Sequence, residues 1–387
     1  MTPTKGLNLH IYPAPILSES RIFRQTLAVA RASLFDEIEI CGTPAHGLPQ
    51  TEPLSEGRTI RRIGADMKRT GSVVARVRYQ VAWSFHVYRT YASSDLRIVN
   101  AHSVAVLPVA AMLARRTGAK LIYDTHELET ETSTSHGLQG QVFRLAERLL
   151  IRKSSAVFVV NDMIKEWYET TYRGLRTISI VNAPDQRAAG AAHDLRAVFA
   201  IPPTDRLFVH VGNIVRARYI VEIIEAFAGR PSDHVVFLGD GDLGRVVDDA
   251  AATLPNVHHH PSVDSDSVTA TLSTADVGIC LIEPTCLSYE LALPNKAIEY
   301  ASAGLPFIHN DLPSVRRLLA EGLTSFLVKD VQGELSRVLD GLSEQVISAG
   351  RAEISEVRLP KWGEESGKML DVYGTLIAAK TRRGGRA

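Results

Sequence analysis

Short runs of β-branched and aliphatic residues alternate with longer segments of helical periodicity along the whole chain. The runs in the first half are LNLHIY, EIEICG, RIVNAH, KLIYD, AVFVVN and ISIVN, and those in the second half are LFVHVG, VVFLGD, VGICLI and PFIHN. Apolar runs of this length, separated by helical patterns, are typical of buried parallel strands. The pattern therefore predicts an α/β protein with two doubly wound, Rossmann-like parallel-sheet domains.

A stretch rich in Ala and Pro interrupts this alternation in the middle of the chain. It predicts a linker over residues 183–205, between an N-terminal domain at 1–182 and a C-terminal domain at 206–360. We expect a cleft at this junction. Residues 361–380 have the pattern of an amphipathic helix, which we expect to pack back on the N-terminal domain, and 381–387 form a basic tail.

Composition narrows the class of protein. The 387 residues are 45% apolar, enough for two cores, and Lys plus Arg equal Asp plus Glu at 43 each, so no overall field attracts nucleic acid. Three cysteines without a C-x-x-C pair argue against a disulfide framework or a zinc knuckle and for a reducing compartment. The sequence contains neither a signal-peptide pattern nor a membrane-spanning apolar run, so we expect a cytoplasmic enzyme.

The segment ELALPNKAIEYASAGLPFI sets charged residues inside an otherwise apolar helical pattern. Pro294 suits the first turn of a helix, and a later Gly and Pro end it. Lys296 and Glu299 then lie beside the helix start, where free N–H groups and a lysine can hold phosphate and a carboxylate can bind a sugar diol. The alternative is a capped surface helix with a solvated lysine and a glutamate that the helix dipole favours.

Two other strand ends carry candidate ligand groups. In VGNIVRARYIVEIIEAF a glycine ends a strand, and Arg216 and Arg218 follow before a helix. Two arginines in such a loop can grip a diphosphate, or they can be ordinary solvated residues. In IYDTHE, His126 and Glu127 come directly after a strand, where open α/β sheets bind ligands. A histidine in this place is more often structural than catalytic.

Three further motifs suggest other kinds of site. GDGDLG at 239–244 follows a strand, as a nicotinamide-binding fingerprint does, but the next strand ends in VHHHP without the acidic residue that such a site needs. DSD at 264–266 mimics a metal-binding pair, and its place at a helix start favours capping. The adjacent histidines at 258–260 alternate in direction along a strand, so they cannot all bind one ion. We predict neither a metal nor a cofactor.

The segment from Gly57 to Ala92 carries eight basic residues against Asp66 alone, with apolar residues at helical spacing. These apolar residues are Val74, Val77, Val81, Phe85 and Tyr88. The pattern is typical of a helix that lies on an anionic membrane, and equally of a core-facing helix with an arginine-rich solvent face.

The order and spacing of six segments carry a resemblance that covers nearly the whole chain. They are NAHSVAVLPVAAMLARRTGAKLIYDTHELE, NAP, HVGNIVRARYIVEIIEAF, VVFLGDGDL, PNKAIEYASAGLPFI and KWGEESGKMLDVY. In these the chain resembles glycosyltransferase family 4, the retaining sugar-nucleotide transferases of GT-B architecture. That resemblance implies two Rossmann-like domains that face a central cleft.

The resemblance also implies roles for particular residues. It places the donor diphosphate on Arg218 and Lys296, the ribose hydroxyls on Glu299 and the donor sugar beside His126. The implied nucleotide-sugar site comprises Gly212, Asn213, Arg216, Arg218, Pro294, Asn295, Lys296 and Glu299, and the implied catalytic residues are His126, Arg218 and Lys296. Acceptor binding is assigned to Ser20, Arg21 and Glu127.

The chain departs from the family pattern at three places. Asn213 stands where the family often has an arginine, so Arg216 is the candidate to replace that phosphate contact. Leu291 stands where the first glutamate of an E-x7-E motif is usual, with Glu290 one step away. The glycine-rich loop that usually follows the first strand is replaced by YPAPILSESR.

The reaction implied by the resemblance is metal-free transfer of a hexose-like group from a nucleoside-diphosphate sugar to an acceptor hydroxyl, with retention at the anomeric carbon. UDP is slightly favoured over GDP. We expect a glycan or lipid-linked acceptor in cell-surface polysaccharide or glycolipid synthesis, at the inner face of the membrane. The alternatives are a transferase for a soluble natural product, a sugar-nucleotide epimerase, a nicotinamide oxidoreductase and a catalytically silent nucleotide-binding subunit.

Overall fold

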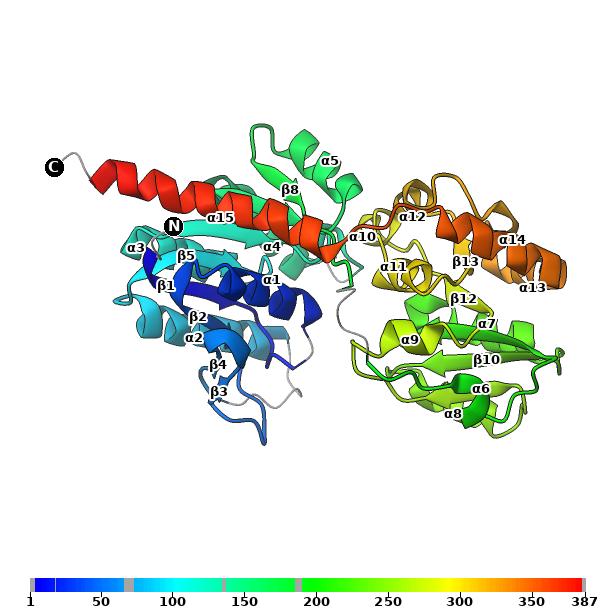
Figure 1. Ribbon diagram of the computed structural model, residues 1–387. Helices are drawn as coiled ribbons and strands as arrows, with labels where there is room; N and C mark the ends of the chain where they lie inside the picture. Colours follow the sequence, from blue (N-terminus) through cyan, green and yellow to red (C-terminus); the bar gives the residue numbers. More distant parts are fainter. Residues whose placement is uncertain (1–3, 18, 66–72, 134–136, 185–189, 385–387) are drawn as a thin grey trace. The chain divides into compact units, whose positions relative to one another are not determined.

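A computed structural model describes residues 4–17, 19–65, 73–133, 137–184 and 190–384. The described chain forms two compact units (Figure 1). Unit 1 contains the residues up to Val181 and those from Glu364 on, and unit 2 contains Asn182–Gly363. The described residues of the segment predicted as a linker, 183–184 and 190–205, belong to unit 2, where Leu195 is fully buried in the apolar core.

The described residues of unit 1 form an eight-stranded sheet in the order β3-β4-β2-β1-β5-β6-β7-β8. Its strands are parallel except for the antiparallel pair β3 and β4. Their bounds are β1 Thr4–Ile11, β2 Phe35–Gly42, β3 Thr51–Pro53, β4 Arg58–Arg62, β5 Leu96–Ala101, β6 Lys120–Asp124, β7 Ala156–Val159 and β8 Thr177–Ser179.

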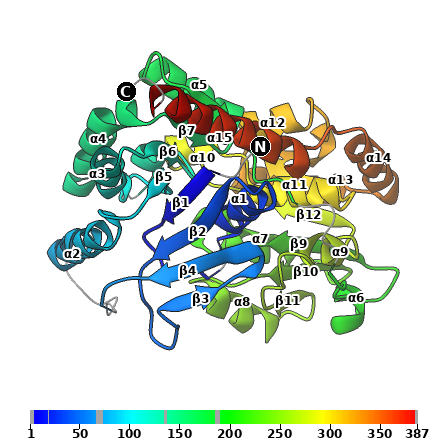
Figure 2. The ribbon, with the colours of Figure 1, turned by 60° about the vertical axis from the view of Figure 1, so that its left-hand side comes forward.

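Helices cover both faces of this sheet. Helices α1 (Ser20–Arg31) and α15 (Trp362–Gly384) lie on one face, and α2 (Val73–Tyr91), α3 (Leu107–Thr117) and α4 (Leu138–Leu150) lie on the other (Figure 2). The short α5 (Asp162–Thr171) connects β7 to β8. Alternation along β1 directs Leu7, Leu9 and Ile11 to one face, and Asn8 and His10 to the face under α1 and α15. Polar groups are thus buried on the second face.

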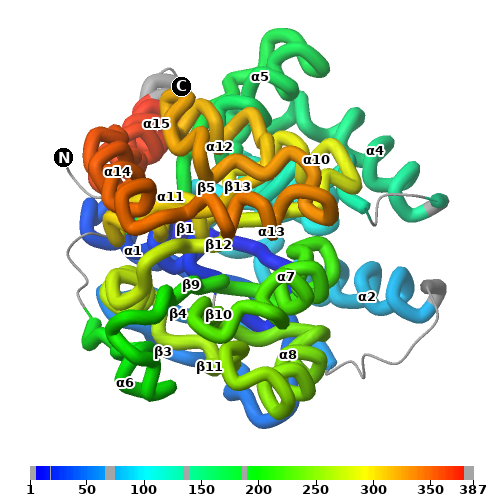
Figure 3. The backbone as a smooth tube through the Cα atoms, turned by 90° about the vertical axis from the view of Figure 1, so that its right-hand side faces the viewer, coloured from blue at the N-terminus to red at the C-terminus, as the bar shows by residue number. Residues whose placement is uncertain are grey.

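The described residues of unit 2 form a six-stranded parallel sheet in the order β11-β10-β9-β12-β13-β14 (Figure 3). Its strands are β9 Arg206–Val211, β10 Asp233–Leu238, β11 Val257–His260, β12 Val277–Cys280, β13 Phe307–Asn310 and β14 Leu327–Val328. Its helices are α6 Leu195–Val198, α7 Ile220–Phe227, α8 Gly244–Ala251, α9 Val268–Leu272, α10 Leu287–Glu290, α11 Asn295–Ser302, α12 Pro313–Leu318, α13 Val331–Gly341 and α14 Glu344–Ser355.

The sequence pattern missed the strand β4 and misassigned the segment around it. Within the predicted amphipathic segment 57–92, β4 occupies Arg58–Arg62, and Arg58 and Arg62 are buried. Their guanidinium groups donate to backbone carbonyl oxygens, that of Arg58 in α1 and that of Arg62 in the loop after β1. These arginines therefore do not face an external partner. Asp66 lies outside the described residues. The helix α2 begins only at Val73, so the membrane interpretation can rest on that part alone.

A buried carboxylate joins three elements of unit 1. Glu147 of α4 is fully buried and accepts hydrogen bonds from the hydroxyls of Tyr123 in β6 (2.9 Å), Tyr168 in α5 (2.7 Å) and Tyr172 (3.1 Å). Burial raises the pKa of Glu147, and the three phenol groups oppose that shift. Because the Tyr123 and Tyr168 hydroxyls would otherwise be buried without a partner, this carboxylate holds α4 and α5 to the sheet.

We predict that Glu147→Ala destabilises unit 1 by about 3 kcal/mol or more, since it strands several buried hydroxyls and leaves a cavity. Thermal and urea unfolding followed by circular dichroism measure the effect. Gln141→Ala, at an exposed position of the same helix, should change stability by less than about 0.5 kcal/mol. Equal midpoints for the two variants would contradict this role of Glu147.

Candidate functional site

In unit 2 the candidate phosphate-binding loop follows β9. Gly212 has φ of +97°, a conformation that side chains other than glycine rarely adopt. A Cβ atom at Gly239 would lie 2.1 Å from the Gly212 carbonyl oxygen, and one at Gly241 would lie 2.3 Å from the Ile214 oxygen. The first two glycines of the GDGDLG motif, Gly239 and Gly241, are therefore required by the close approach of two backbone segments. This gives the motif a steric reason that needs no nicotinamide cofactor.

The helix α11 begins at the PNK sequence. Pro294 precedes the first helical residue with φ of −65°, and Asn295 is exposed at the first position. Tyr300 anchors the helix, because its hydroxyl accepts the Val211 N–H (3.0 Å) and lies 2.9 Å from the Val209 carbonyl oxygen. Its ring packs where Gly278 has no side chain; a Cβ there would lie 2.7 Å from the ring. The start of α11 is thereby fixed against the ends of β9 and β12.

Lys296 lies in the first turn of α11 and is 8% exposed. Its Nζ is 3.3 Å from Nε2 of His210 in β9, which accepts from the ammonium group. Burial lowers the pKa of Lys296 to about 8. The nearby positive charge of Arg218 also lowers it, whereas Cys280 and Glu299 oppose the shift. A negative ligand would reverse this effect.

Arg218 is held beside Tyr289 of α10. Its guanidinium carbon lies 5.0 Å from the centre of that ring, and Nη1 donates to the Ala217 carbonyl oxygen (2.9 Å). Arg216, two residues earlier, is exposed. Throughout the described chain, no carboxylate forms an ion pair with Arg216, Arg218 or Lys296. Unit 2 thus presents cations whose charge is not neutralised within the protein.

The other residues predicted for this site surround the same loop and helix. Glu299 lies one turn into α11, on the helix that carries Lys296, and Asn213 is exposed beside Gly212. At the position where a glutamate is usual, Leu291 offers its carbonyl oxygen to the Ser314 hydroxyl at 3.0 Å, and Glu290 is exposed. The described structure brings the β9 loop and α11 together within unit 2, and the ligand roles assigned to these residues stay predictions.

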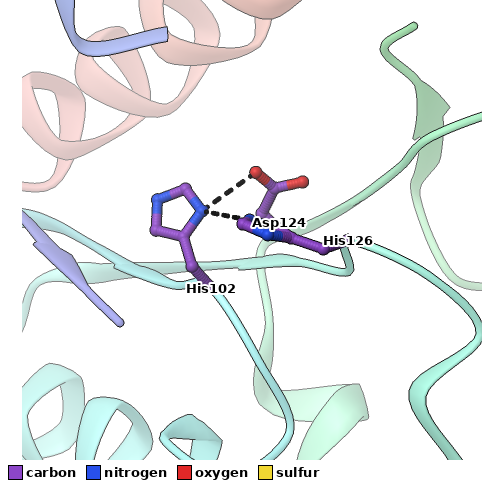
Figure 4. A group of neighbouring side chains, drawn as sticks. All are labelled: His102, Asp124 and His126. Atoms are coloured by element: carbon purple, nitrogen blue, oxygen red, sulfur yellow. Dashed lines mark hydrogen bonds and ion pairs between the residues drawn. The ribbon is translucent and has the colours of Figure 1, made fainter. Parts of the chain in front are cut away.

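In unit 1, His126 follows β6 and is partly exposed (Figure 4). Its ring stacks on Tyr12, with centroids 5.3 Å apart, and its Nε2 lies 3.2 Å from Nδ1 of His102. The same His102 nitrogen is 3.1 Å from Oδ2 of Asp124, the last residue of β6. Burial lowers the pKa of His126 to about 3, so this imidazole is neutral at physiological pH.

Arg21 of α1 is 5% exposed and is directed into the unit. It donates to both oxygens of Asp124, with the shortest contact at 2.6 Å, and to the Ile180 carbonyl oxygen at 2.6 Å. Ser20 is the first residue of α1 and partly exposed, and Glu127 is exposed next to His126. The acceptor roles predicted for Arg21, Ser20 and Glu127 remain predictions, and for Arg21 any such role would act through Asp124.

The sequence reasoning missed His10, His102 and Asp124, although a signal was present. The strand NLHI has polar residues at alternate positions, and so does NAH, which covers the last two residues of the neighbouring strand β5 and the residue after it. Residues two apart in a strand share a face, so adjacent parallel strands with this pattern place their polar groups side by side. The alternation therefore marked a buried polar cluster that the apolar composition of these strands concealed.

Comparison with known proteins identifies the family. Residues 22–181 match the family model described as glycosyl transferase 4-like domain, and residues 205–345 match glycosyl transferases group 1. The chain belongs to the group 1 (family 4) glycosyltransferases. It is 24% identical over 315 residues to a phosphatidyl-myo-inositol mannosyltransferase of Mycolicibacterium smegmatis, an alignment that spans 79% of this chain and 78% of the relative.

Solved structures show the same GT-B architecture. A sucrose-phosphate synthase of Thermosynechococcus elongatus aligns with a TM-score of 0.76 at 16% identity, over 97% of this chain and 100% of that one. The HepE protein of Anabaena, in a complex with UDP-glucose, aligns with a TM-score of 0.68 at 14% identity, over 96% of this chain and 100% of that one. The transferase thus has two parallel-sheet α/β domains of GT-B type.

The buried state of Lys296 predicts a pH-dependent affinity for uridine diphosphate, used as the probe. The free lysine loses its proton as the pH rises through about 8, whereas a bound diphosphate favours the charged form. Affinity should therefore fall between pH 7.5 and 9.5, a range in which the phosphate groups, with a second pKa of about 6, do not titrate. Calorimetry in buffers of different ionisation enthalpy should show proton uptake above pH 8.

Lys296→Arg is the matched control, because a guanidinium stays charged across this range. That variant should bind uridine diphosphate with little pH dependence and no proton uptake. If the parent protein shows the same flat profile, Lys296 does not contact the diphosphate.

Proposed function

We propose that this glycosyltransferase is a retaining, metal-independent enzyme that transfers a sugar from a nucleoside-diphosphate sugar to an acceptor hydroxyl. The observation that carries the proposal is a pair of cations without an ion-pair partner among the described residues, namely Arg218 in the loop after β9 and Lys296 at the start of α11. Like charges held close together are unfavourable in an unliganded protein. A diphosphate removes that cost and uses the free N–H groups of the same helix start.

The same cations suit the chemistry of transfer. When the bond from the anomeric carbon to the donor phosphate breaks, negative charge develops on the departing oxygen. Fixed positive groups at that oxygen stabilise the transition state more than the ground state, without the need for a metal ion. Glu299 is the proposed partner of the ribose hydroxyls, and neutral His126 is the proposed partner of the donor sugar.

The names of three similar proteins support the substrate classes. One structure is a complex with UDP-glucose, and the similar mycobacterial enzymes are called phosphatidyl-myo-inositol mannosyltransferases. We therefore propose a uridine or guanosine diphosphate hexose as donor, with uridine first, and a lipid-linked acceptor in glycolipid or polysaccharide synthesis. A soluble acceptor is the alternative if no membrane binding is found.

A panel of nucleoside diphosphates and their sugars tests this function. Ligands that bind the folded state raise the unfolding midpoint by mass action, so the true donor should give the largest shift. Incubation of that donor with a lipid extract should then yield a product whose anomeric configuration, measured by NMR, matches that of the donor. Turnover without any acceptor would instead indicate an epimerase, and binding without turnover would indicate a silent subunit.

Arg218→Ala should lower kcat by about a hundredfold or more, because its contact strengthens as the diphosphate leaves. Arg216→Ala is the matched control: it removes an equal charge from an exposed position of the same loop and should cost less. Both are measured with saturating donor, and circular dichroism checks the fold. If both variants lose only a little kcat, and by the same factor, the two arginines are ordinary solvated loop residues.

The helix α2 supplies the observation behind the proposed membrane contact. It buries Trp83, Val87 and Tyr91 against the unit, whereas Val77, Val81 and Phe85 are 48%, 64% and 57% exposed. The sequence had suggested these three residues either for the core or for a membrane, and they do not face the core. Four-residue spacing places them in one row along the outer side of the helix. Arg76, Arg78 and Arg89 are exposed on the same helix.

Two neighbouring helices extend this exposed apolar row. Helix α3 packs against both α2 and α4 on the same face of the sheet (Figure 2). The exposed apolar residues of α3 and α4 are Met112, Val142, Leu145 and Leu149. Exposed basic residues accompany them, namely Arg115, Arg116 and Arg148. Glu147 is the one carboxylate in the three helices, and it is buried.

We propose that an anionic membrane covers this three-helix surface. A large exposed apolar area in a soluble protein usually marks an interaction site, and a surface whose exposed charges are all positive favours acidic phospholipids over an acidic or neutral apolar protein face. Among the described residues, no helix is both long and apolar enough to cross a membrane. Contact would therefore be peripheral, with apolar side chains in the interface and arginines at the headgroups.

Sedimentation with vesicles of phosphatidylglycerol and phosphatidylcholine tests this contact. Anionic vesicles should bind the protein at low salt, and binding should weaken with salt, since each basic residue contributes about 1 kcal/mol near an anionic surface. Replacement of Val77, Val81 and Phe85 by serine should abolish binding. Serine at Val221 and Val246, exposed valines of unit 2, should leave it unchanged. Equal recovery with neutral vesicles would overturn the proposal.

A further inference from the structure

A chain of buried polar side chains runs through unit 1 and ends at His126. His10 in β1 lies 2.8 Å from Oδ1 of Asn8 through Nε2, and its Nδ1 lies 2.8 Å from Nε2 of His102. The other nitrogen of His102 faces both Asp124 and His126 (Figure 4). Asn8, His10, His102 and Asp124 are fully buried. The rings of His10 and His102 are stacked, with centroids 5.1 Å apart.

The donor atoms of His102, Asp124 and His126 lie within 4.8 Å of one another, which is the spacing of a possible metal site. The surroundings of Asp124 oppose that reading. Its oxygens already accept from the Arg21 guanidinium and, at 2.8 Å, from the Gln25 amide. A cation would have to displace these donors and lie beside a buried positive charge. The cluster is therefore better described as a hydrogen-bond network.

The position of one proton follows from the partners. Both oxygens of Asp124 are acceptors, since Arg21 and His102 hold the pKa of this carboxyl well below its usual value despite its burial. The His102 Nδ1 that faces the carboxylate at 3.1 Å must therefore carry a proton. This conclusion depends on Asp124 and not on His10, whose Nε2 donates to Asn8 Oδ1 because the Asn8 amide nitrogen donates to the Ile98 carbonyl oxygen.

The state of His126 follows in turn. Its Nε2 lies 3.2 Å from the same protonated nitrogen, so Nε2 must be the acceptor and its proton must reside on Nδ1. Stacking on Tyr12 fixes the plane of the ring. A neutral imidazole in this tautomer can donate a hydrogen bond from Nδ1 and cannot act as an imidazolium acid.

We infer that His102, oriented by Asp124, is a positioning residue that fixes His126 as the Nδ1–H tautomer, so that this group donates to a neutral hydroxyl of the ligand. The inference rests on the proposed function for the identity of that hydroxyl, a sugar hydroxyl of the donor. The tautomer itself is a property of the free protein. It assigns to His102 a role in setting the direction of the hydrogen bond to His126.

Two isosteric substitutions separate this role from packing. The amide nitrogen of asparagine occupies the place of the imidazole Nδ1, and that of glutamine occupies the place of Nε2. His102→Asn keeps a donor toward Asp124 and His126, whereas His102→Gln keeps one toward His10 instead. Activity of His102→Asn should stay within about threefold of the parent, whereas His102→Gln should lose tenfold or more in kcat.

The pH profile gives a second readout. The titratable or charged groups around His126 are Asp124, His102, Arg21, Tyr12, Glu127 and Glu129. Loss of the imidazole at 102 removes one neighbour that lowers the pKa of His126 and leaves Asp124, which raises it. His102→Gln also loses the N–H that donates to Nε2 of His126, so its kcat should fall as the pH drops from 7 to 5. In His102→Asn the amide N–H still donates to Nε2 and opposes its protonation, so this variant and the parent should lack that limb.

Long-range nitrogen–proton NMR of the histidine-labelled protein measures the tautomer of His126 directly and needs no activity assay. The His126→Gln variant assigns the signals of this ring. The parent should show His126 with a protonated Nδ1 and a bare Nε2, and His102→Asn should match it. A protonated Nε2 in the parent, or identical spectra and rates for the asparagine and glutamine variants, would overturn the inference. If no donor is turned over but the tautomer is as expected, the proposed function fails and the positioning role stands.

Discussion

The arrangement of unit 1 depends on the buried carboxylate of Asp124. An unpaired charge at this depth would be strongly unfavourable, and the surrounding elements supply the donors that it needs. Arg21 comes from α1, Gln25 lies one turn further along the same helix, and His102 follows β5. The position of α1 on the sheet, the orientation of His102 and, through it, the state of His126 all follow from one ionised group at the end of β6.

The guanidinium of Arg21 also connects Asp124 to the segment at which the chain leaves unit 1. Besides Asp124, it donates to the carbonyl oxygen of Ile180, one residue before the chain leaves unit 1 at Val181. The Val181 N–H donates to Glu365 of α15 at 2.9 Å, which secures the segment where the chain returns. Asp124, Arg21 and the two crossing segments are therefore parts of one hydrogen-bonded structure.

In unit 2, by contrast with the paired charges around Asp124, the cations of the candidate site have no carboxylate partner among the described residues. Lys296 and Arg218 are held rigidly, by His210 and Tyr289, but neither contact supplies negative charge. Tyr300, by bonding to β9 and β12, determines where the helix that carries Lys296 begins. A binding site for a polyanion requires cations that are held in place but not neutralised by the protein. The ligand then gains the full charge interaction, and the side chains lose little conformational entropy when it binds.

The sequence by itself determined the fold class and one half of the candidate site. Parallel strands that are apolar on both faces can be recognised by their composition. The loop with Arg218 and the helix start at Lys296 are local motifs, each made of residues that lie close together in the sequence. The strand β4 was not predicted, because a segment so rich in arginine resembles an exposed surface segment. Only the structure shows the carbonyl oxygens to which its buried arginines donate.

Tertiary structure alone decided the rest. Asn8, His10, His102 and Asp124 meet only when β1, β5 and β6 align in register, and Arg21 is separated from Asp124 by 103 residues. Likewise, no periodicity could tell that Trp83 rather than Phe85 would face the core, since both sides of α2 are apolar enough to be buried. Which polar groups neutralise one another, and which apolar face remains exposed, depends on long-range packing that a local pattern does not contain.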